Sequence, residues 1–109
     1  MNSSSILVGN RSYDIVSLND EDFDQILFKK NAYEPQIKSF IDYDEQLICV
    51  RKRLKSDHKQ ELVLHELLHA CADDAGIDQD EKFESFVRSF SPRLSSLLSC
   101  GLQNVINKI

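Results

Sequence analysis

The sequence lacks an excess of positive charge. Its 13 Lys and Arg residues are outnumbered by 18 Asp and Glu residues, and the formal net charge is −5 at pH 7. Nucleic-acid-binding domains usually carry a clustered excess of Lys and Arg. The one basic segment, VRKRLK at 50–55, is interpreted as the solvated end of a strand, with contact to an anion or an acidic peptide as the alternative. We therefore expect no nucleic-acid partner.

Long apolar runs are also absent. The opening segment MNSSSILVGN has only three consecutive large apolar residues and no basic residue before them. It therefore has the features of neither a signal peptide nor a membrane span. We expect a protein that stays in the cytoplasm and has no membrane partner.

Paired cysteines are missing as well. Cys49, Cys71 and Cys100 are an odd number, lie far apart and form no CxxC pair. This pattern does not suit a disulfide framework or a cysteine-based zinc site. We expect free, buried thiols in a reducing compartment.

Extended segments dominate the first half of the chain. GNRS at 9–12 is a Gly-Asn turn signal that predicts a hairpin near the N-terminus. Asp20 is expected to cap a short helix after this hairpin. The apolar residues of that helix are Phe23, Ile26 and Leu27. Strands are predicted in SILV at 5–8, YDIVSL at 13–18, IKSFIDYD at 37–44 and EQLICVRKRL at 45–54, whose LICV run is expected to be buried.

A helix from about 58 to 75 is predicted in the second half. Asp57 and Gln60 match a capping box at its start, and Gly76 is typical of a helix C-terminus. Its core stripe follows three- and four-residue spacing. The residues of this stripe are Leu64, Leu67, Leu68, Cys71 and Ala75.

A second helix is predicted to follow at once. Asp78 and Glu81 match another capping box, and Pro92 is expected to kink or restart the helix because its ring cannot continue the hydrogen-bond ladder. The apolar stripe of this helix comprises Phe83, Phe86, Val87, Phe90, Leu94, Leu97 and Leu98.

The order of the elements indicates the fold class. Strands come first and two helices last, which predicts an α+β fold with a small, mostly antiparallel sheet packed against the helix pair. The chain has 109 residues, of which 41% are apolar and 28% charged, and it contains no internal repeat or linker. We expect one globular domain over 1–109.

The segment HELLH at 65–69 is an HExxH motif on a predicted helix. His65 and His69 are four residues apart, so both imidazoles project from one helix face and can bind a single ion. Glu66 lies about 100° round the helix, where its carboxylate can act as a general base. The alternatives are two ordinary helix histidines, or a zinc site that is structural or inactive.

A catalytic zinc needs a third protein ligand. The remaining histidine, His58, is two turns from His65 and too far to share the ion. Glu84 is favoured because it flanks the apolar stripe of the second helix and should face the first. An exposed ion pair with Arg88 is the alternative role of Glu84. The carboxylates downstream of the motif are Asp73, Asp74, Asp78, Asp80, Glu81 and Glu84.

LVLHELLHACADDAGI at 62–77 and EKFESFVRSFSPRLSSLL at 81–98 resemble the small HExxH proteins of phages and prophages. This family is a minimal branch of the zincin-fold metallopeptidases, related to the ImmA/IrrE group. The resemblance implies a zincin-like fold with one Zn²⁺ bound by His65, His69 and Glu84, and Glu66 as general base. It also implies that the strand in DEQLICVRKRL at 44–54 is the edge along which an extended peptide lies.

Two functions are compatible with these residues. The first is a zinc-dependent peptidase that acts on a peptide or protein substrate, with Tyr43 or Arg88 as possible transition-state donors. The second is a zinc-stabilised module that binds a host protein and cleaves nothing. The short chain has no subdomain for the far wall of a cleft, so a protein partner could complete it. A protein group closing the fourth metal position, from a nearby Asp or Cys71, would favour the binding module.

Overall fold

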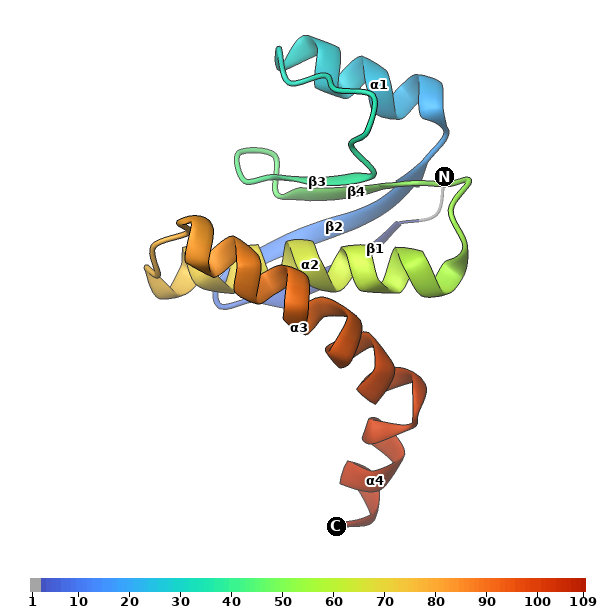
Figure 1. Cartoon of the computed structure of the whole chain (residues 1–109), viewed down its shortest axis with the longest axis vertical. Coiled ribbons are helices and arrows are strands. Elements are labelled where there is room, and N and C mark those ends of the chain that lie inside the picture. Colours follow the sequence, from blue (N-terminus) through green and yellow to red (C-terminus); the bar gives the residue numbers. More distant parts are fainter. Residues whose placement is uncertain (1–2) are drawn as a thin grey trace.

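The computed structural model describes residues 3–109 (Figure 1). Met1 and Asn2, which begin both the expected domain and the segment considered for a signal peptide, lie outside the described residues. The elements are β1 (Ser3–Val8), β2 (Arg11–Leu18), α1 (Asp20–Lys29), β3 (Ser39–Asp42), β4 (Leu47–Arg51), α2 (Ser56–Ala75), α3 (Glu81–Ser99) and α4 (Leu102–Lys108).

The four strands form one mixed sheet in the order β1-β2-β4-β3. β1 and β2 form the expected antiparallel hairpin, with the Gly9–Asn10 turn between them and Gly9 at φ 60°. β3 and β4 are also antiparallel, whereas β2 and β4 are parallel. After β2 the chain passes through α1 and enters the sheet at its far edge as β3, and the hairpin from β3 to β4 then places β4 beside β2 and parallel to it. The fold is thus α+β, with a mixed sheet in which two of the three strand pairs are antiparallel.

The position of β4 corrects one prediction. The strand within 44–54 was expected to be the edge of the sheet, but β4 pairs on one side with β2 and on the other with β3. Ile48 and Cys49 at its centre are completely buried, as predicted for the LICV run. The edge beside the HExxH helix is therefore β3.

Helices cover both faces of the sheet. α1 packs on one face and α2 on the other, and α3 crosses the outer side of α2 (Figure 1). On the α1 side, Phe23 and Leu27 pack against Val16 and Cys49. On the α2 side, Ala70 packs in a cluster with Val8, Tyr13 and Ile48. Alternate residues of β2 and β4 thus supply two small cores, one on each face.

The start of α1 and the basic segment differ from expectation. Asn19, not Asp20, caps α1, and its Oδ1 accepts a hydrogen bond from the backbone N–H of Asp22 at 2.8 Å. Asp20 instead pairs with Arg51, which also contacts Asp24 at 2.8 Å. Arg51 is only 3% exposed, so the basic segment does not begin as a solvated strand end. The two Asp side chains of α1 make its burial possible.

The caps of α2 and α3 also differ from the predicted capping boxes. Lys55 occupies the N-cap position of α2 without a side-chain hydrogen bond, and within residues 3–109 the Asp57 side chain accepts a hydrogen bond only from the adjacent N–H of His58. α3 begins after Asp80, whose Oδ1 accepts from the backbone N–H of Phe83 at 2.9 Å. The cap is therefore two residues later than the predicted Asp78. The C-terminal role of Gly76 is confirmed, because its φ is 70°.

The predicted apolar stripes are only partly buried. On α2 the buried residues are Glu66, Ala70 and Ala72, whereas Cys71 and Ala75 are exposed. The physical reason is that α2 lies between the sheet and α3, so its contacts fall on two different faces. On α3 the buried residues are Val87, Ser91 and Ser95. The stripe residues of α3 that are exposed are Phe86, Phe90, Leu97 and Leu98.

The structure tests the expectations for the cysteines and for a restart of the helix at Pro92. Cys49 is buried, and burial raises the pKa of its thiol to about 12, but Cys71 and Cys100 are exposed. α3 does not restart at Pro92, because one helix continues from Glu81 to Ser99.

The short helix α4 was not predicted. Within residues 3–109, none of the helices has the length and apolar character that a membrane span requires.

Candidate metal centre

The candidate centre lies where α2 and α3 meet. His65 and His69 project from the same face of α2, as their four-residue spacing predicts. Glu84 is in the first turn of α3, and its backbone N–H donates to the carbonyl of Asp80 at 3.0 Å. The short turn that starts at Gly76 brings this first turn alongside the HExxH segment. Three residues from two helices therefore share one site.

The ligand atoms of these three residues converge. His65 Nε2 is 3.3 Å from Glu84 Oε1, and His69 Nε2 is 2.8 Å from Glu84 Oε2. Each pair of ligand atoms lies within 4.8 Å. Four ligands at about 2.0–2.1 Å from one ion stand about 3.4 Å apart in a tetrahedron. The distances and the chemistry of the donors therefore fit a group that could hold a metal ion.

Glu66 lies beside the ligands, buried to 7% exposure. Burial raises the pKa of its carboxyl group, and the hydrogen bond from Ser39 Oγ to Glu66 Oε2, at 2.7 Å, opposes the rise together with the charges of His65 and His69. The Ser39 bond also orients the carboxylate. Glu66, His65 and Glu84 line the same cavity of about 500 Å³. The carboxylate can therefore reach a small molecule held next to the ligand atoms.

Sequence reasoning missed Gln79, which lies in the turn between α2 and α3. Its Oε1 is 2.6 Å from His69 Nδ1, and the same oxygen accepts a hydrogen bond from Tyr43 Oη at 3.2 Å. With an amide oxygen as acceptor, Nδ1 of His69 carries the hydrogen, and Nε2 is the ring atom that faces Glu84 and could bind a metal ion. No motif in the sequence marks Gln79, because a turn glutamine has no characteristic spacing.

The structure also places the two suggested transition-state donors. The Tyr43 hydroxyl donates to Gln79, and Tyr43 is not among the residues that line the cavity. Burial raises the pKa of this hydroxyl. Arg88 does line the cavity, and its Nε contacts Glu84 Oε1 at 3.3 Å. The ion pair between Arg88 and Glu84 thus exists together with the approach of Glu84 to the histidines.

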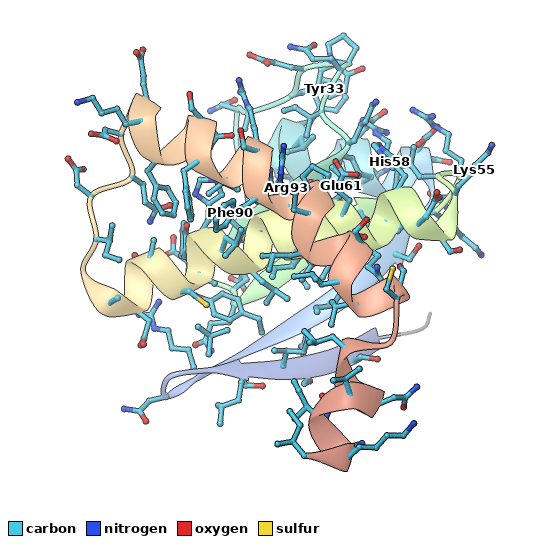
Figure 2. All side chains as sticks on the ribbon, turned by 60° about the horizontal axis from the view of Figure 1, so that its bottom comes forward. Tyr33, Lys55, His58, Glu61, Phe90 and Arg93 are labelled. Atoms are coloured by element: carbon cyan, nitrogen blue, oxygen red, sulfur yellow. The ribbon has the colours of Figure 1, made fainter. Side chains whose placement is uncertain are left out.

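The other ligand candidates lie elsewhere. Asp73 contacts Arg11 at 3.7 Å, and Asp80 caps α3. His58 is close to Lys55 at the N-terminal end of α2, far from the turn that leads to α3 (Figure 2). Asp74, Asp78 and Glu81 are exposed. Over residues 3–109, His65, His69 and Glu84 are the one group of His, Cys, Asp and Glu side chains found close enough together to hold a metal ion.

Comparisons with protein-family models, with curated proteins and with solved structures find no match to this chain. The description of the site therefore rests on its own geometry. An α+β chain brings His65, His69 and Glu84 together from two helices, in an arrangement that could hold a metal ion.

Proposed function

We propose that this protein is a zinc-dependent peptidase of a minimal zincin type. The observation that carries the proposal is the convergence of His65, His69 and Glu84 at a cavity that Glu66 also lines. Imidazole and carboxylate ligands suit zinc, and three protein ligands with an open fourth position are typical of catalytic zinc sites. One Zn²⁺ per chain would be bound by the two Nε2 atoms and the Glu84 carboxylate.

Zinc, when bound, supplies an acidified water and polarises the carbonyl of the substrate. Glu66 takes the proton of the attacking water and then passes it to the leaving amine. Its buried position favours this role, since burial raises the pKa of the carboxyl group and makes it a stronger base than an exposed Glu. Ser39 binds Oε2 of Glu66 and leaves Oε1 for the water.

We propose that the substrate lies along β3. This strand is one of the two edge strands of the sheet, and Ser39 at its start lines the same cavity as Glu66. An extended peptide can add to a free strand edge through backbone hydrogen bonds. The cavity is open and lies between β3 and α3, so a protein partner could supply a further wall.

The alternative is a zinc-stabilised module that binds a host protein without cleaving it. Such a site would have a fourth protein ligand. Cys71, one candidate, is exposed and lines a different, apolar groove with Leu68 and Phe83. No fourth His, Cys, Asp or Glu of the described part of the chain joins the triad. This observation favours the peptidase.

Bound metal in purified protein tests the proposal. We expect one zinc per chain in the wild type and little in Glu84→Ala, whereas Asp73→Ala, a control on the same helix pair, should keep its zinc. Glu66→Gln should keep zinc and lose hydrolysis of a peptide library, and His65→Ala should lose both. Hydrolysis that survives in Glu66→Gln would contradict the mechanism, and a wild type that takes up no zinc would contradict the proposed function.

A further inference from the structure

The cavity at the candidate centre has two walls of different origin. One wall is the segment from Gln36 to Ser39, which leads into β3, and the other is the first half of α3 with Glu84 and Arg88. α2 forms the floor, where His65 and Glu66 lie. A peptide in this cavity would pass between the two walls.

The acidic groups of the cavity already have roles at the centre. Glu84 approaches both histidines, and Glu66 is held by Ser39 beside them. A bound divalent cation would offset both carboxylate charges. The charged groups that remain for a substrate are Lys38 and Arg88, one from each wall, and both are positive.

Both cations are available to a ligand. The Arg88 side chain is 73% exposed, and its closest ion-pair contact within residues 3–109 is that of Nε with Glu84 Oε1 at 3.3 Å. Lys38 is exposed and has no carboxylate within 4.0 Å in the same part of the chain. A carboxylate ligand can therefore approach both side chains from solvent.

The positive charge of Lys38 and Arg88 at the cavity contrasts with the negative net charge of the chain. The chain carries 18 acidic and 13 basic residues, so an acidic ligand is repelled by the protein as a whole. A pair of cations at the cavity counteracts that repulsion at the one place where a peptide would bind. Complementary charges of this kind give selectivity and orientation more than affinity.

We propose that the cavity selects peptides that carry a carboxylate close to the bond placed at the centre, and that Lys38 and Arg88 are the residues that attract it. The inference rests on the proposed peptidase function for the position of the peptide. It adds a substrate class, acidic peptides, which the three metal ligands do not specify.

The test uses zinc-loaded Glu66→Gln protein, so that peptides bind without being cleaved. Three acetylated and amidated hexapeptides differ only in a central Glu, Gln or Lys, and a fourth is the Gln peptide with a free C-terminal carboxylate. Calorimetry gives each Kd. Because exposed ion pairs are weak, two of them predict about a 3- to 10-fold preference for Glu over Gln at low salt, and a smaller one at 0.5 M salt.

Three substitutions test whether the preference for the Glu peptide arises from the two cations of the cavity. Lys38→Gln in the same background should remove most of the preference for Glu, and Arg88→Gln should do so too when the proteins are compared at equal zinc loading, since Arg88 contacts Glu84. Lys52→Gln makes the same charge change in the turn after β4, outside the cavity, and should keep the preference. Far-UV circular dichroism shows that each variant is folded.

The outcomes separate this inference from the proposed function. Equal binding of the Glu, Gln and Lys peptides, or a preference that Lys38→Gln and Arg88→Gln both retain, overturns the inference even if the wild type hydrolyses peptides. Selective binding of Glu peptides by a wild type that hydrolyses nothing supports the inference and overturns the peptidase. If the preference for Glu is found and the peptide with the free C-terminus also binds more tightly than the amidated Gln peptide, the cavity accepts a carboxylate at the chain end as well.

Discussion

At the scale of single residues, one amide oxygen links two parts of the fold at the candidate metal centre. Gln79 Oε1 accepts from His69 Nδ1 and from Tyr43 Oη, and Tyr43 follows β3. A metal-binding histidine usually donates its other ring N–H to an acceptor that fixes the orientation of the ring. Gln79 has this position relative to His69.

Gln79→Leu removes the acceptor and keeps a side chain of similar size. We expect the zinc Kd to rise about 10- to 100-fold, as is typical when such a partner of a ligand is lost. Competition with a zinc chelator measures the change. Gln103→Leu makes the same substitution on exposed α4 and should leave the Kd unchanged. An unaltered Kd in Gln79→Leu would show that His69 is oriented without this hydrogen bond.

Asp42 is a buried carboxylate at the end of β3. It is 6% exposed, pairs with Lys30, and accepts hydrogen bonds from the backbone N–H groups of Asp44 and Glu45 at 3.1 Å each. Burial alone would raise the pKa of this carboxyl group. The Lys30 ammonium and the two N–H donors outweigh burial and hold the pKa below its usual range. The ionised form is therefore stabilised by folding.

This arrangement predicts a pH-dependent contribution to stability. A pKa depressed by folding stabilises the protein above the unfolded-state pKa of about 3.9, and the effect is lost as the pH falls through the folded-state pKa. Asp42→Asn should lower the free energy of unfolding by about 1–3 kcal/mol at pH 7. Urea titrations between pH 7 and pH 2.5 should show the wild type and the variant converging in acid. A difference that stays constant over this range would contradict the role of the charge.

At the scale of elements, the N-cap of α3 affects both the stability of that helix and the position of Glu84 at the candidate metal centre. Asp80 accepts from the N–H of Phe83, and the first turn that it stabilises carries Glu84. α2 has no such side-chain cap, since Asp57 accepts only from its neighbour. α2 is held instead by contacts with the sheet on one side and α3 on the other.

Alanine substitutions distinguish these two helix starts. Asp80→Ala should lower the free energy of unfolding by about 1 kcal/mol, which is typical for loss of an N-cap. Asp57→Ala should change it by less than about 0.5 kcal/mol, because no N-cap hydrogen bond is lost. Asp80→Ala should also weaken zinc binding, since Glu84 lies in the loosened turn. Thermal and urea unfolding measure the first effect and chelator competition the second. Equal losses in the two variants would contradict the observed caps.

At the scale of the whole molecule, the C-terminal part is loosely attached. α4 extends away from the sheet and from α2 (Figure 1), and none of its residues is buried. It follows Gly101, whose φ of 87° turns the chain at the end of α3. Its apolar residues Val105 and Ile106 are 57% and 50% exposed. α4 therefore contributes little to the core.

Removal of residues 102–109 tests this description. We expect the shortened chain to keep its zinc content and to lose less than about 0.5 kcal/mol of its free energy of unfolding, since no buried contact is removed. Calorimetric or optical unfolding and elemental analysis measure these two quantities. A loss of several kcal/mol would mean that α4 packs on the body of the protein in solution.

Local features of the chain could be predicted without the structure. The α+β class, the hairpin at GNRS and the αL position of Gly76 follow from patterns within a few residues. His65 and His69 share a helix face because helical periodicity alone requires it. Glu84 was favoured among six carboxylates, and the position of α3 against α2 brings it within reach of both histidines.

The remaining features depend on contacts between segments far apart in the sequence. The central place of β4, the approach of Ser39 to Glu66 and the hydrogen bond of Gln79 to His69 each join different elements, and no local spacing encodes them. The exposure of Phe86 and Phe90 on α3 has the same origin, because it depends on which elements pack against that helix. The sequence by itself therefore determined that two candidate metal ligands share one helix face, and only the tertiary structure decided which residues surround them.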